Sequence, residues 1–348
     1  MLWSANDCWR ICIRHILMRE ETNGINCTKN VLRQTGREIS KKLCDELINR
    51  TYHPLPSDCF VITDPKHREV FAAHFRDRIV HHLYFNYTHE IFERTFIQDS
   101  YSCIKGRGTH YGINRLRHHI LKESHNYTRP CFVLKMDIRG YFMSINRHVL
   151  LDPTKECRII GSETDWDELP YEKSMFHSPV GCGLPIGNLT SQLFSNVYLN
   201  VFDQFMKREL HCCHYGRYVD DFYVVCDDKE WLCSLINPIK KFLMEQLCLS
   251  VHDGKTQIIP IEKGVEYLGA FVLPYRIYVS RSTLGRMDVK LKALGLENNK
   301  EHICNALNSY CGVLSHWQNY NIRRTILLSR HGFTKLGMFD YDLRHYYD

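Results

Sequence analysis

The chain lacks any stretch of about 18 consecutive apolar residues, the length that a membrane-spanning helix requires. Its first 21 residues also lack the uninterrupted apolar core of a signal peptide, because Asp7, Arg10 and Arg14 interrupt them. These two absences argue against a membrane protein and against export through such a leader. We therefore expect a protein without a membrane partner.

The sequence also has no Cys-x-x-Cys pair, although it contains 16 cysteines. Scattered cysteines in a chain of this size indicate reduced thiols in a cytoplasm and not a disulfide framework. The tightest cluster is HCCH, from His211 to His214. Adjacent cysteines fit tetrahedral zinc poorly, and no second cluster is spaced to complete a site. We expect a cytoplasmic protein without a zinc site at this cluster.

A strong charge imbalance, an internal repeat and a low-complexity segment are likewise missing. The net charge is +6, with 24% charged and 44% hydrophobic residues. Such a mild excess permits a polyanionic partner such as a nucleic acid but does not require one. The 348 residues are enough for a sizeable core and two or three subdomains.

The hydrophobic patterning predicts helices and strands in separate blocks. Apolar residues at helical spacing predict helices over five stretches: 1–50, 66–94, 189–210, 231–251 and 282–348. Runs of strand formers predict strands inside 51–65, at 131–138, on both sides of Asp220–Asp221, and between 251 and 280. This order predicts an α+β fold with antiparallel hairpins and not a regular β-α alternation.

Two adjacent carboxylates, Asp220 and Asp221, interrupt strand-forming residues in the stretch YVDDF. Like charges beside an apolar sheet are costly unless cations neutralise them. Asp137 ends another apolar strand about eighty residues earlier, and the three carboxylates converge if the two strands are neighbours. Oxygen-rich, negative sites suit Mg²⁺. A solvated turn is the ordinary alternative for an Asp-Asp pair.

The ordered series KMDIRGYF, GLPIGNLTSQ, YVDD, GKT and EYLG resembles the motifs of reverse transcriptases. The resemblance covers roughly residues 60–280 and implies a right-hand polymerase fold with fingers, palm and helical thumb. The segments that it implies are an N-terminal helical extension (1–50), fingers (51–130), a palm (131–280) with an insertion at 150–180, and a thumb (281–348).

The resemblance also implies a catalytic centre for nucleotidyl transfer. Asp137, Asp220 and Asp221 fall on the family's metal-binding carboxylates, with Asp220 the direct ligand and Asp221 more peripheral. The backbone carbonyl of Ile138 is expected to reach a metal as well. Two Mg²⁺ ions are the implied cofactors. Lys255 matches a lysine near the triphosphate, where it could stabilise charge or act as an acid.

Further matches concern the nucleotide and the primer. Phe142 falls on the aromatic that blocks a ribose 2′-OH, which implies selection of dNTPs. Core packing is the alternative for such a ring. Tyr267, Leu268 and Gly269 match the primer-grip turn, where glycine lets the backbone approach nucleic acid closely.

Basic residues in the predicted fingers match positions that contact template and nucleotide. Arg76 and Arg78 lie on a helix whose basic face would otherwise be interpreted as solvated. Arg107 matches the second arginine of the family pattern FRPxR. The first falls on Ile104, a departure, with Lys105 beside it.

The motif IGxxxSQ narrows the resemblance to one subgroup. Most reverse transcriptases have QGxxxSP where this chain has Ile186, Gly187, Ser191 and Gln192. The IGxxxSQ form resembles the enzymes of diversity-generating retroelements, which copy a template-repeat RNA into cDNA with errors at adenines. It implies template-repeat RNA, a primer and dNTPs as partners. It also implies a small basic accessory variability protein and a bacterial or phage-infected cell. Because Ile186 replaces a polar Gln near the nascent base pair, it could lower selectivity there.

Two other functions stay open at this point. One is a retron or abortive-infection reverse transcriptase, which would be recognised by its genomic neighbours. The other is a catalytically silent scaffold that binds nucleic acid, against which the presence of all three carboxylates argues.

Overall fold

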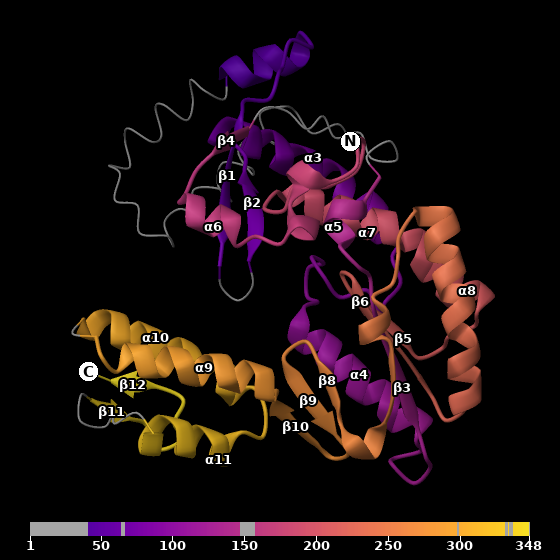
Figure 1. Ribbon diagram of the computed structural model, residues 1–348, viewed down its shortest axis with the longest axis vertical. Coiled ribbons are helices and arrows are strands. Elements are labelled where there is room, and N and C mark those ends of the chain that lie inside the picture. The colour runs from indigo at the N-terminus through magenta and orange to yellow at the C-terminus, as the bar shows by residue number, and fades with distance from the viewer. Residues whose placement is uncertain are drawn as a thin grey trace.

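We describe a computed structural model of the chain (Figure 1). It describes residues 41–63, 67–146, 157–297, 299–330, 333 and 337–347. Most of the predicted N-terminal extension (1–50) and residues 150–156 of the predicted insertion therefore lie outside the described residues. Within the described ranges, no helix is long and apolar enough to cross a membrane.

The first described region combines a small sheet with a long helix. The sheet has the order β2-β1-β4, formed by Arg68–Ala72, Ser57–Ile62 and Cys157–Ile159, and the helix α3 spans Phe75–Glu93. The helix predicted over 66–94 is therefore wrong at its start. Residues of β2 alternate between more and less buried, as strands do, and pair with β1. The helix begins only at Phe75, after the extended cap residue His74.

The central sheet carries the main core. Its order is β5-β6-β3-β7, formed by Tyr215–Tyr218, Asp221–Cys226, Phe132–Asp137 and Gln257–Pro260, and every neighbouring pair is antiparallel. This confirms the strands predicted at 131–138 and around Asp220–Asp221. Because side chains alternate between faces, Phe222 and Val224 join one core cluster, whereas Tyr223 and Val225 join the other.

Helices cover both faces of this sheet (Figure 1). On one face lie α7 (Leu189–Gln204), extended by the π-helical turn η3 (Phe205–Glu209), and α8 (Lys229–Leu247). On the other lie α4 (Thr109–Glu123) and a second antiparallel sheet of β8 (Val265–Tyr267), β9 (Ala270–Leu273) and β10 (Arg276–Val279). The helix predicted at 189–210 is confirmed, and so is the one predicted at 231–251 except for its end, since α8 stops at Leu247.

A third core lies in the C-terminal part, which Figure 1 shows grouped beside β8–β10. It contains α9 (Arg281–Leu294), α10 (Lys300–Ser315), α11 (Tyr320–Arg323) and the π-helical segment η6 (Arg324–Arg330). The helical prediction for 282–348 is wrong at its end, where β11 (Met338–Phe339) and β12 (Tyr346–Tyr347) pair antiparallel. Tyr346 is buried against the helices, so tertiary packing fixes this hairpin.

Candidate active site

The three predicted carboxylates meet at one end of the central sheet. Asp137, the last residue of β3, lies directly opposite Asp221, the first residue of β6. Directly opposed residues of antiparallel strands have Cβ atoms about 5 Å apart. Asp220 lies in the two-residue turn between β5 and β6, and its carbonyl accepts a hydrogen bond of 3.1 Å from the backbone N–H of Ile138.

The electrostatics of this group favour a cation. Burial, followed by the charge of the neighbouring Asp137, raises the pKa of Asp220 to about 6. Burial also raises the pKa of Asp221 to about 6, although Lys135 opposes the shift. The Oδ1 atom of Asp221 is buried and has no hydrogen-bond partner among the described residues.

Two lysines partly neutralise the carboxylates. The Nζ atom of Lys255 lies 2.9 Å from Oδ1 of Asp137, and that of Lys135 lies 3.3 Å from Oδ2 of Asp221. Three carboxylates against two cations leave one negative charge in excess. An unpartnered buried oxygen and this excess negative charge are what an oxygen-preferring divalent cation would relieve, so the residues present fit such an ion.

Lys255 reaches the site from a turn and not from the strand expected for HDGKTQIIPI. It ends the 3-10 turn Asp253–Lys255, and β7 begins only at Gln257. The strand prediction between 251 and 280 is therefore wrong at Lys255. The side chain is half exposed, so it can contact a ligand as well as Asp137.

Phe142 lies in α5 (Tyr141–Ser144), directly after the strand that ends in Asp137. Its ring is half-buried, with its centroid 5.3 Å from that of Tyr141. Its carbonyl accepts a 2.8 Å hydrogen bond from the N–H of Leu184. The structure thus brings Phe142 next to the GLPIGN loop.

That loop contacts the β2 strand through its backbone. The N–H of Phe71 donates to the carbonyl of Ile186 at 2.7 Å. Gly187 has φ +120°, and a Cβ there would lie 2.7 Å from the carbonyl oxygen of Phe71. Only glycine fits this close approach. At the start of α7, Ser191 is buried and its hydroxyl has no hydrogen-bond partner in the described part of the chain, while Gln192 is exposed.

The predicted basic contacts differ in their surroundings. Lys105 is exposed. Arg107 donates to the carbonyls of Ile97 and Ser100 at 2.8 and 2.9 Å, so it holds its own loop.

On α3, the guanidinium of Arg76 forms an ion pair with Glu46 and lies 5.1 Å from the ring centroid of Tyr52. That of Arg78 lies 5.5 Å from the ring centroid of Phe75. Arg76 therefore has protein partners that the sequence does not reveal.

The residues matched to a primer grip form the turn between β8 and β9. Leu268 and Gly269 both have positive φ, 49° and 82°, as a tight two-residue hairpin requires. The Tyr267 ring is fully buried and packs edge-to-face on Tyr223 with centroids 5.1 Å apart. Tyr267 is thus a core residue, Leu268 packs partly against the same core, and Gly269 is the exposed residue of the turn.

Three residues near the site were missing from the sequence predictions: Arg217, Asp203 and Lys135. Arg217 and Asp203 are both fully buried and form an ion pair of 2.6 Å beneath the Asp220 turn. The signal available in the sequence was the position of Asp203, which lies one helical turn after Leu199 and therefore on the buried face of α7. Charged residues are usually exposed, so neither residue stood out.

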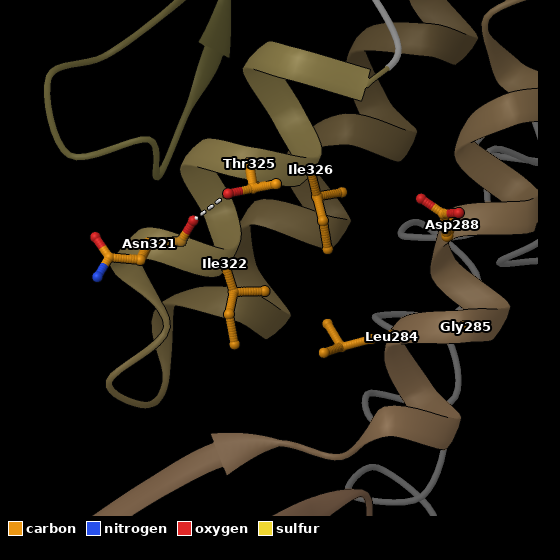
Figure 2. Close-up of a pocket in the computed structure, with 7 residues that line it drawn as sticks. All are labelled: Leu284, Gly285, Asp288, Asn321, Ile322, Thr325 and Ile326. Carbon is orange, nitrogen blue, oxygen red and sulfur yellow. Dashed lines mark hydrogen bonds between the residues drawn. The ribbon is translucent and has the colours of Figure 1, made fainter.

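A surface pocket lies away from these residues, in the C-terminal part of the chain. A cavity of about 390 Å³ opens between α9 and α11, where Leu284 faces Ile322 (Figure 2). The Thr325 hydroxyl donates to the carbonyl of Asn321 at 2.9 Å at its edge. None of the predicted site residues lines it, so this hollow is not the candidate active site.

Residues 64–272, more than half of the chain, match the family model described as reverse transcriptase (RNA-dependent DNA polymerase). The protein YkfC of Escherichia coli (strain K12) is 24% identical over 310 residues, covering 77% of this chain and 79% of the relative.

Solved telomerase structures are more distant. The apo telomerase of Candida tropicalis, truncated from its C-terminal domain, is 13% identical with a TM-score of 0.44, covering 70% of this chain and 60% of that one. The Candida albicans telomerase in complex with a fragment of telomeric RNA is 12% identical with a TM-score of 0.44, covering 85% and 62%. The chain thus spans about three fifths of the length of these telomerases.

The α+β fold of the right-hand polymerases, expected from the sequence, is confirmed: the antiparallel palm sheet is present, and the family match covers it. The chain belongs to the family described as reverse transcriptase (RNA-dependent DNA polymerase).

Proposed function

We propose that Asp137, Asp220 and Asp221 hold two Mg²⁺ ions and that the chain extends a primer with dNTPs on an RNA template. The observation that carries this proposal is the register of Asp137 opposite Asp221. It places carboxylates from distant parts of the chain side by side, with one oxygen unpartnered. The carbonyl of Ile138 is proposed as a further ligand.

Bound Mg²⁺ ions would supply Lewis-acid activation of the primer 3′-OH and charge compensation for the triphosphate. The chain's own residues orient the reactants. Lys255, half exposed and 2.9 Å from Asp137, can turn its ammonium group toward the leaving pyrophosphate, where positive charge stabilises the transition state. The half-buried ring of Phe142 is proposed to exclude a ribose 2′-OH.

Other predicted contacts complete the proposal. The exposed Lys105, in the loop before α4, would contact phosphates. Arg76, Arg78 and Arg107 would contribute positive charge to the fingers while keeping their protein contacts. The turn at Leu268–Gly269, following the buried Tyr267, would support the primer.

The proposed segment boundaries are fingers at 51–130, palm at 131–280 with an insertion at 150–180, and thumb at 281–348. The division is supported by the separate core in the C-terminal helices.

The test is primer extension on an RNA template by Asp137→Asn. We expect incorporation to fall by at least about 100-fold, because a carboxylate charge is lost at the reacting centre. Asp167→Asn is the matched control, since Asp167 is an exposed carboxylate at the end of α6 (Glu163–Asp167). Wild-type rates in folded Asp137→Asn would refute the proposal.

We further propose that the chain serves a diversity-generating retroelement. It would copy a template-repeat RNA into cDNA with frequent errors at adenines, together with a small basic accessory protein. The support is the motif that spans Ile186, Gly187, Ser191 and Gln192. Ile186 is half-buried, and its side chain replaces a polar group where hydrogen bonding would sharpen selection.

Fidelity on adenine-containing RNA tests this finer role. Ile186→Gln is expected to lower misincorporation opposite adenine relative to the other bases, while Ile186→Leu, which stays apolar, keeps it. An active Ile186→Gln enzyme with unchanged error at adenine would contradict the role of Ile186. In the flanking DNA, the proposal requires a repeat pair that differs mainly at adenines, and the lack of such a pair would refute the retroelement role.

A further inference from the structure

Arg217 is a fully buried cation on β5, three residues before Asp220. Its Nε atom lies 2.7 Å from Oδ1 of Asp203, and its Nη2 atom lies 2.6 Å from Oδ2. This two-point contact joins β5 to α7, because Asp203 lies in the last turn of that helix. Such planar pairing uses the fork of the guanidinium and cannot be copied by lysine.

The remaining donors of Arg217 reach the turn and two neighbours. Nη1 donates to the carbonyl of Val219 at 3.0 Å and to the side-chain oxygen of Asn196 at 3.4 Å. Nη2 also donates to the hydroxyl of Ser100 at 3.2 Å. All five N–H groups of the guanidinium are therefore satisfied, and one of them is used on the backbone of the carboxylate turn.

The backbone of Val219, which accepts the hydrogen bond from Arg217, has an unfavourable conformation. Its φ is +56°, in the left-handed region, where a β-branched residue is a genuine outlier. A backbone of this kind persists only when its surroundings hold it, and such positions cluster at active sites. The backbone of the Val219–Asp220 turn sets the direction of the Asp220 carboxylate. It also leads directly into β6, which begins at Asp221.

Stability alone is a weak reason for this arrangement. A buried ion pair is often no more stabilising than well-packed apolar residues of similar volume. The structure instead connects the pair directly to the turn that carries two of the three carboxylates.

We infer that Arg217 and Asp203 form a positioning pair that fixes the Val219–Asp220 turn, so that Asp220 and Asp221 converge with Asp137. Neither residue touches the reacting atoms, and both act through the geometry of the turn. The inference rests on the proposed role of the carboxylates and deepens it.

The test compares three variants in single-nucleotide extension on RNA. Arg217→Lys keeps the charge but cannot contact Asp203 at two points and Val219 at once. We expect its kcat to fall about 100-fold, as misplacement by about 1 Å does, with KM for the dNTP nearly unchanged. The double variant Arg217→Met with Asp203→Leu replaces the pair by apolar side chains. We expect it to fold, with the same loss of kcat and a higher Mg²⁺ concentration at half-maximal rate.

Tyr215→Phe is the matched control. The Tyr215 hydroxyl also donates to Asp203, at 2.6 Å, but it does not bond to the turn, so kcat should stay near wild type. If the double variant does not fold, Asp203→Asn is measured in its place. It keeps the shape of the side chain, and we expect the same fall in kcat.

The outcomes separate the two claims. Wild-type kcat and Mg²⁺ dependence in the folded double variant, or in Asp203→Asn if that variant is used, would overturn the positioning role and leave the proposed function intact. Full activity of Asp220→Asn in the same assay would overturn the proposed function itself.

Discussion

Asp220→Asn is expected to stabilise the metal-free protein while abolishing its activity. In the folded chain the pKa of Asp220 is raised from its usual 3.8 to about 6 by burial and by Asp137. A raised carboxyl pKa means that the folded state binds the proton more tightly than the unfolded state. The ionised carboxylate therefore costs stability at pH 7.5, and Asn removes that cost.

The magnitude follows from the size of the shift. At about 1.4 kcal/mol per pKa unit, a change from 3.8 to about 6 is worth about 3 kcal/mol at pH 7.5. For a chain of this size we expect a rise in Tm of about 4 °C. The cost disappears progressively as the pH falls from about 6 to 3.8, so the gain from Asp220→Asn should be roughly half as large at pH 5.

The assay is thermal unfolding in EDTA at pH 7.5 and pH 5, then with Mg²⁺ added. Mg²⁺ should raise the Tm of the wild type at pH 7.5 and raise that of Asp220→Asn much less, because the variant lacks a ligand charge. Asp167→Asn, which removes an exposed carboxylate at the end of α6, should change neither curve. A lower Tm for Asp220→Asn than for the wild type in EDTA at pH 7.5 would contradict the claim that the ionised Asp220 carboxylate destabilises the metal-free fold.

Three further substitutions test the packing at Gly187 and the roles of Phe142 and Lys255. Gly187→Ala should lower Tm, because φ +120° and a Cβ 2.7 Å from the Phe71 oxygen cost about 2 kcal/mol or more; an unchanged Tm would contradict this packing. Phe142→Ala should raise the ratio of kcat/KM for rNTPs to that for dNTPs, and an unchanged ratio would remove Phe142 from sugar selection. Lys255→Gln should reduce kcat/KM at least about 10-fold. Its Tm should barely change, since an exposed ion pair with Asp137 adds at most about 1 kcal/mol. A lower Tm with full activity would instead assign Lys255 to the stability of the fold and not to the reaction.

The meeting of the carboxylates could be predicted because it depends on local signals. Asp137 ends an apolar strand, and Asp220–Asp221 interrupt a second apolar run with a turn. Antiparallel pairing of neighbouring strands then brings their ends together. The structure gives this register, with Asp137 opposite Asp221.

Other features depend on contacts that the sequence does not display. Val70 and Phe71 continue the helical spacing of α3, yet pairing with β1 makes them a strand. Arg107 looks like a free basic residue but holds backbone carbonyls of its own loop. The buried pairing of Arg217 with Asp203 was not predicted, because charged side chains in strands and helices usually face solvent.

The most direct measurement is localised cleavage of the folded chain by Fe²⁺ placed in the Mg²⁺ site, with ascorbate and peroxide to generate hydroxyl radicals. Radicals formed at a bound ion cut the nearest backbone, so we expect cuts at two places: after β3 near Asp137 and in the turn at Asp220–Asp221. Excess Mg²⁺ and Asp137→Asn should suppress both cuts together. Cleavage at only one of these places, or cleavage that persists in Asp137→Asn, would contradict a shared metal centre built from these three carboxylates.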